Sequence, residues 1–156
     1  MSRSKGSDRS KESPRNVTWM KRYGAVVRHQ ARTGSMPREF ASPMGDKERE
    51  EENKMAGWVR FQRRRADRGV MPVWERELLE QLPGFSWDPL GEQWDRWCGL
   101  LNTFLITVGR MPRYRSLSPS EKALAAWVHK QRHLFRAGSL SVERVASLRS
   151  QPYKIV

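Results

Sequence analysis

The residue types in this sequence that are best suited to chemistry are basic side chains on one face of a helix. Residues 54–68 carry apolar side chains at spacings of three and four, and a turn of about 100° per residue places basic side chains opposite them. The basic residues of this face are Arg60, Arg63 and Arg64. Guanidinium groups bind phosphate oxygens, so this face predicts a contact with nucleic acid. A solvated helix face is the alternative, although such a face more often mixes both signs of charge.

The same pattern recurs 69 positions further along the chain. The outward residues there are His129, Arg132, His133 and Arg136. Their repetition at a fixed distance suggests two similar surfaces offered to a repetitive, acidic partner.

Two arginines outside these helices are further candidates, because each follows a Gly-x-Met-Pro turn, at Arg38 and Arg113. Glycine ends a helix there and proline forbids its continuation. Each arginine is a candidate phosphate contact, with a solvated loop residue as the alternative.

Two glutamines, Gln62 and Gln131, lie on the apolar faces of the repeated helices. Glutamine can hydrogen bond an adenine edge in two places. A buried glutamine more commonly satisfies a backbone group of a neighbouring helix, and we favour that structural role. For the adjacent Arg63 and Arg132, a salt bridge to an acidic group is the alternative to phosphate, and both possibilities remain open. The acidic candidates are Glu77 and Glu143.

The sequence offers little for catalysis. His129 and His133 have a spacing that can bind metal, but no glutamate lies beside the first and no clear third ligand is present. There is no phosphate-binding loop and no Ser, His and Asp set that local sequence can pair. We therefore expect a protein that is not an enzyme and that has no cofactor and no metal.

The chain contains one helical plan twice. A first block that begins at Trp19 recurs 75 positions later, and a second block that begins at Trp58 recurs 69 positions later, so the first copy has six extra residues between the blocks. Helical spacing, capping residues and glycine stops predict three helices in each copy, and no segment alternates with the period of a strand. The expected helices run over about 16–33, 46–68 and 73–82, then 89–108, 119–137 and 142–149.

The predicted fold is therefore all-α, with two tandem three-helix units over 16–89 and 90–156 and a disordered basic tail over 1–15. Five residues are expected to form the apolar stripe of the first helix: Val17, Met20, Tyr23, Val27 and Ala31. Four tryptophans on apolar stripes are expected in the cores: Trp19, Trp58, Trp94 and Trp127. Two others have no counterpart in the second copy and are candidates for exposed stacking or for packing between copies: Trp74 and Trp87.

The net charge of the chain indicates what kind of partner it binds. The chain has 30 Lys and Arg against 17 Asp and Glu, a net charge of +13, divided as +3 over 1–15, +3 over 16–89 and +7 over 90–156. This charge favours nucleic acid or an anionic membrane surface. No stretch has the length of a transmembrane helix and no signal peptide is visible, so we expect no membrane partner. A single cysteine, Cys98, fits a cytoplasmic protein, associated with the nucleoid if it binds DNA.

The repeated motifs resemble the helicase-associated domain, a small three-helix module of bacterial proteins. The resemblance rests on an early tryptophan, a Gly-x-Met-Pro-Arg turn and a Trp-Val-x-x-Gln-Arg segment, each found twice within residues 16–153. Such domains often follow a helicase core, are common in mobile-element proteins and are taken to bind nucleic acid. This chain has no helicase motor, and its second copy ends without the closing Gly and Trp of the first.

The residues and the resemblance together predict a nucleic-acid-binding protein, with DNA preferred to RNA. A protein adaptor that docks onto a helicase or another replication partner, with Trp74 and Trp87 as anchors, is the first alternative. A factor associated with RNA or the ribosome is the second.

Overall fold

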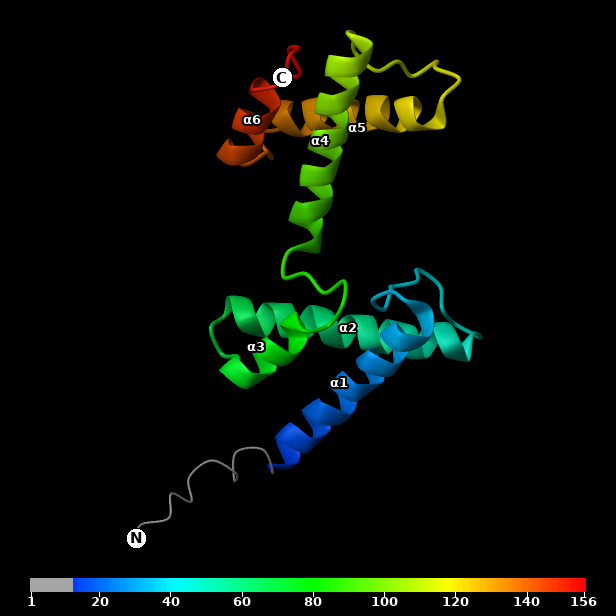
Figure 1. The fold of residues 1–156 in the computed structure, drawn as a ribbon, viewed down its shortest axis with the longest axis vertical. Coiled ribbons are helices and arrows are strands. Elements are labelled where there is room, and N and C mark those ends of the chain that lie inside the picture. The colour runs from blue at the N-terminus through cyan, green and yellow to red at the C-terminus, as the bar shows by residue number, and fades with distance from the viewer. Residues whose placement is uncertain (1–12) are drawn as a thin grey trace. The chain divides into compact units, whose positions relative to one another are not determined.

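The computed structural model describes residues 13–156, and in that range it contains six helices and no strand (Figure 1). The chain divides into a first unit that ends at Trp87 and a second unit over Asp88–Val156. The first unit contains α1 (Pro14–Thr33), α2 (Lys47–Asp67) and α3 (Val73–Glu80). The second contains α4 (Pro89–Val108), α5 (Pro119–Arg136) and α6 (Val142–Arg149). The prediction of an all-α chain with two three-helix units is confirmed.

Capping residues set the starts of the helices, and the start of α1 and the boundary of the second unit differ from the prediction. Helix α1 begins at Pro14, two residues early, because the Ser13 hydroxyl accepts a hydrogen bond from the Asn16 N–H at 3.2 Å. The second unit begins at Asp88, whose carboxylate accepts from the Gly91 N–H at 2.9 Å. Of the tail expected over 1–15, residues 1–12 lie outside the described residues, and the last three belong to the start of α1.

One buried hydrogen bond joins the first and second helices of each unit. The Trp19 indole N–H donates to the Gln62 side-chain oxygen at 3.0 Å, and Trp94 donates to Gln131 at 3.0 Å. The glutamines are only 1% and 2% exposed. Their role is therefore structural, as favoured above, although the partner is an indole ring and not a backbone group. In both units the side-chain oxygen is already engaged by an indole N–H of the same unit.

Apolar packing around these bonds follows one plan in both units. Leu79 of α3 and its counterpart Leu148 of α6 are completely buried. Trp19, Trp58 and Trp94 are buried as predicted, whereas Trp127 is half-buried and stacks on Trp97 with ring centroids 6.3 Å apart.

The predicted apolar stripe of α1 is wrong at four of its five positions. Tyr23 is half-buried and packs against the core, whereas Val17, Met20, Val27 and Ala31 are exposed. The buried side chains of α1 are Trp19, Val26 and His29. These residues also follow helical spacing. Burying the large indole of Trp19 against α2 removes more apolar surface from water than burying the smaller residues would.

The first unit adds a buried ion pair to the Trp–Gln bond. Arg65 donates to Glu75 at 2.6 Å and to Gln62 at 2.7 Å, and both charged residues are buried. The equivalent positions in the second unit are Leu134 and Arg144, so that unit lacks this pair. We assigned Arg65 no role from the sequence, although it lies three residues after Gln62, on the inward side of α2.

The two glutamines provide a matched stability test. Gln131→Leu leaves the Trp94 N–H buried without an acceptor, and we expect a loss of about 1–3 kcal/mol in the free energy of unfolding. Gln62→Leu should cost more, because Arg65 loses an acceptor as well. Urea denaturation of both variants measures the difference. Equal losses, or none, would contradict the role given to these bonds.

Candidate nucleic-acid interface

The outward face of α5 carries most of the candidate residues in the second unit. His129, Arg132, His133 and Arg136 are exposed, and residues 122–142 contain no Asp or Glu. The buried Gln131 and Val128 hold the opposite side of the helix against the core. The structure therefore brings these four side chains onto one solvent-facing helix surface without an acidic residue among them.

The outward face of α2 differs in how its arginines are engaged. Arg60 forms an exposed ion pair with Glu39 at 2.6 Å, so part of its charge is already compensated. Arg64 is exposed, and its guanidinium lies 6.0 Å from the centre of the Phe61 ring. Because exposed ion pairs are weak and exchange readily, Arg60 stays available to a competing phosphate.

Arg63 and Arg132 hold the end of each unit in place. The Nε–H of Arg63 donates to the Ser86 carbonyl at 2.7 Å, and that of Arg132 donates to the Ile155 carbonyl at 2.7 Å. Each bond spans 23 residues, so the repeat continues to the last residues of the chain.

These bonds go to backbone carbonyls, whereas we had considered carboxylates as the structural partners of the two arginines. Arg63 is also half-buried and not on a fully solvated face, which corrects the predicted arrangement of α2. Arg132 remains exposed beside its carbonyl partner.

A buried carboxylate positions the turn that carries each remaining candidate arginine. Glu52 accepts from the Arg38 backbone N–H at 2.9 Å, and its counterpart Glu121 accepts from the Arg113 N–H at 2.8 Å. Both arginine side chains remain exposed. Glu52 is only 9% exposed, although it belongs to an acidic stretch near the start of α2.

Glu121 has the most perturbed pKa at this surface. Hydrogen bonds from the Arg110 guanidinium, and then from the Ser116 hydroxyl, lower the pKa of Glu121 to about 2. The Arg110 bonds are 2.5 and 3.3 Å long and the Ser116 bond is 2.7 Å. This carboxylate therefore stays charged and fixes the turn before α5 at all ordinary pH values.

Trp74 and Trp87, the candidate protein anchors, pack within the first unit. The Trp74 ring lies edge-on to Trp19 with centroids 5.0 Å apart. The Trp87 N–H donates to Glu80 at 2.9 Å, and the Arg76 guanidinium lies 4.6 Å from its ring centre. Both tryptophans are half-buried, so they offer less surface to a partner than exposed side chains would.

Over residues 13–156, no group of three or more His, Cys, Asp and Glu side chains is arranged to hold a metal ion. None of the helices described is long and apolar enough to cross a membrane.

The Glu121 contacts predict a pH dependence of stability. The folded pKa of about 2 lies below the ordinary 4.5, so the stabilisation is complete above pH 4.5 and is lost as the pH falls towards 2. Glu121→Gln should lower the stability of the second unit at neutral pH, and its difference from the parent should shrink below pH 4.5. Urea denaturation followed by the amide NMR signals of residues 88–156 measures this. Asp95→Asn, an exposed carboxylate of the same unit, is the control; the interpretation fails if it behaves like Glu121→Gln.

Comparison with known proteins places the first unit in a family. The model of the helicase associated domain family matches residues 16–88. This segment contains the Trp19–Gln62 bond and the Glu52-supported turn described above, with all of α2 and α3. Searches of the curated proteins and of the solved structures gave no match to this chain. The first unit of the chain thus matches the helicase associated domain family over nearly all of its described residues.

Proposed function

We propose that the chain is a non-enzymatic protein that binds nucleic acid, DNA in preference to RNA, through the outward faces of α2 and α5. The observation that carries this proposal is the absence of Asp and Glu over residues 53–66 and 122–142, where both helices expose basic side chains. A helix face that serves solubility alone more often mixes both signs of charge. The α5 face carries one sign of charge, whereas the α2 face has Glu39, paired with Arg60, and Asp67 at its end. An excess of basic side chains on both helices suits the phosphate backbone.

The balance of charge within each unit supports the same partner. Residues 88–156 contain eleven Lys and Arg against five Asp and Glu, and residues 13–87 contain fifteen against ten. The second unit therefore has six more basic than acidic residues, and the first has five more. Such an excess attracts a polyanion and accelerates its association.

We infer that the second unit is a diverged copy of the first. The supporting observations are the shared Trp–Gln bond and the arginine bond to the closing segment, at equivalent positions in both units. Two copies would bind neighbouring stretches of one strand or duplex, and linked sites raise the overall affinity.

A second candidate function, docking onto a helicase, is favoured by the family to which the first unit belongs. In that case the half-buried Trp74 and Trp87 would contribute their accessible edges to a protein interface. This function predicts a contact that depends little on salt, which separates it from phosphate binding.

A salt titration tests the proposed function. Roughly 4 to 8 phosphate contacts predict that the logarithm of the DNA affinity falls with the logarithm of salt concentration with a slope of about −4 to −7. Fluorescence anisotropy with duplex DNA, single-stranded DNA and RNA of matched sequence measures the slope and the preference. A slope near zero would contradict phosphate binding and favour the adaptor.

Matched arginine variants test which side chains bind. Arg64→Glu and Arg136→Glu should weaken DNA binding and reduce the salt slope by about one contact each, without a change in the thermal midpoint. Arg63→Ala and Arg132→Ala should lower the midpoint, because the Ser86 and Ile155 carbonyls lose their donors, at a cost of about 1 kcal/mol each. If both exposed-arginine variants bind like the parent, the basic face is only a solvated surface.

A further inference from the structure

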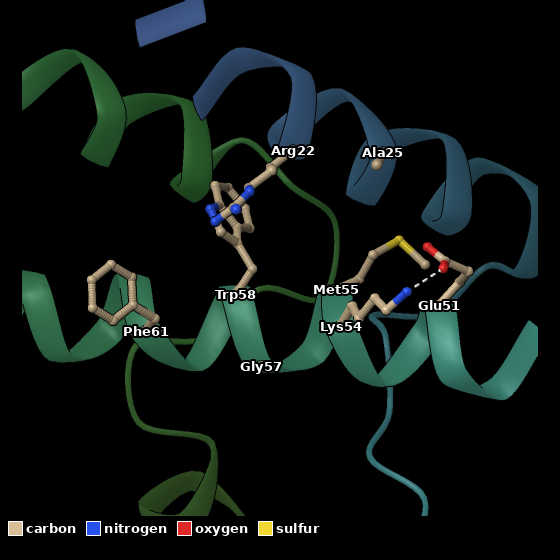
Figure 2. A pocket seen from close by; sticks show the side chains of 8 residues that line it. All are labelled: Arg22, Ala25, Glu51, Lys54, Met55, Gly57, Trp58 and Phe61. Carbon is tan, nitrogen blue, oxygen red and sulfur yellow. Dashed lines mark hydrogen bonds and ion pairs between the residues drawn. The ribbon is translucent and has the colours of Figure 1, made fainter. Parts of the chain in front are cut away.

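Each unit has a groove between its first two helices. In the first unit, two adjoining cavities of about 530 and 400 Å³ share Arg22, Trp58 and Phe61 as lining residues. Figure 2 shows the larger one, with Arg22 entering from α1 and with Trp58 and Phe61 on α2. In the second unit a cavity of about 290 Å³ is lined mainly by α4 and α5.

The two grooves are built from equivalent positions. Trp19 and Gln62 line the first groove, and their counterparts Trp94 and Gln131 line the second. The same residues form the buried hydrogen bond that joins the two helices of each unit. The groove therefore follows from the way in which the first two helices are joined, and it is present in both units.

Each groove is also lined by one aromatic ring and one cation at a second pair of equivalent positions. The helix that supplies the ring in one unit supplies the cation in the other. In the first unit Arg22 comes from α1 and Phe61 from α2. In the second unit the ring is Trp97, from α4, and the cation is Lys130, from α5. Phe61 is 46% exposed, which is unusual for a phenylalanine beside a core. The combination of a ring and a cation is thus kept although the residues differ.

The charge around both grooves favours an anionic occupant. In the first groove the only carboxylate among the described lining residues, Glu51, is paired with Lys54 at 2.6 Å, which leaves Arg15 and Arg22 in excess. The second groove is lined by Lys130 and Arg144, and the described residues around it include no acidic side chain. An occupant that satisfies both grooves has a flat apolar face next to a negative charge.

We propose that each groove holds an unpaired nucleotide of a single-stranded nucleic acid, with its base against the aromatic ring and its phosphate beside the cation. This proposal rests on the proposed function and adds the place where a base binds. A base within a duplex is already stacked on both sides and offers no face, whereas every unpaired base does. The groove therefore gives the chain a preference for single strands that the basic outer faces alone do not provide.

The test compares oligothymidylate, oligouridylate and a duplex DNA of equal length on the full chain. Phe61→Ala should weaken binding of the single strands by about 5- to 150-fold, the range for loss of one stacked base, and leave duplex binding unchanged. Phe61→Tyr keeps a ring and should restore binding. Val27→Ala, an exposed apolar residue of the same unit outside the groove, is the control.

The second groove is tested in the same way with Trp97→Leu and Trp97→Phe, and with Ile106→Ala as the exposed control on α4. A thermal midpoint for each variant separates loss of binding from loss of folding. If Phe61→Ala binds single strands like the parent, or weakens single strands and duplex equally, the groove proposal is wrong while the proposed function stands. A parent chain that binds none of the three nucleic acids overturns both.

Discussion

A tryptophan N–H that is removed from water must find an acceptor, and this requirement organises both units. The acceptor is a glutamine of the second helix in each case, Gln62 for Trp19 and Gln131 for Trp94. The bond fixes which face of the second helix turns inward. Arg64 and Arg136 are therefore turned outward. Arg63 and Arg132 are turned towards the closing segment, while Arg65 is buried beside Gln62. The bonded residues are 43 positions apart in the first unit and 37 in the second, because the connection in the first unit is six residues longer. The bond length is nevertheless the same, 3.0 Å.

Around this shared bond the two units are stabilised in different ways. The first unit buries Arg65 and Glu75 as an ion pair beside Gln62, whereas the second has Leu134 and Arg144 at these positions. A buried ion pair stabilises only while both partners are present, and an apolar substitute can do as well. The interiors of the two units therefore differ, whereas both units expose basic side chains on the second helix and both have a groove.

The helices could largely be predicted from the sequence, because capping residues and apolar spacing lie within the helices or directly beside them. Asp46, Asp88 and Ser118 each cap a helix whose start was placed within a residue, and the inward stripe of α2 follows from its spacing. The buried face of α1 could not be predicted from the sequence. More than one set of its apolar residues follows helical spacing, and only packing against α2 determines which set is buried. The hydrogen bonds of Arg63 and Arg132 could not be predicted either. Their acceptors are backbone carbonyls 23 positions away, and every residue has such a carbonyl, so the sequence does not mark them.

The most direct test of this account is an NMR titration of the full chain with a single-stranded oligonucleotide, followed through backbone amide and tryptophan indole signals. The account predicts that the shifts concentrate on the outward faces of α2 and α5 and on the groove residues Phe61 and Trp97, while the indole signals of the hydrogen-bonded Trp19 and Trp94 persist. Shifts confined to the region of Trp74 and Trp87, or no shifts at all, would contradict it.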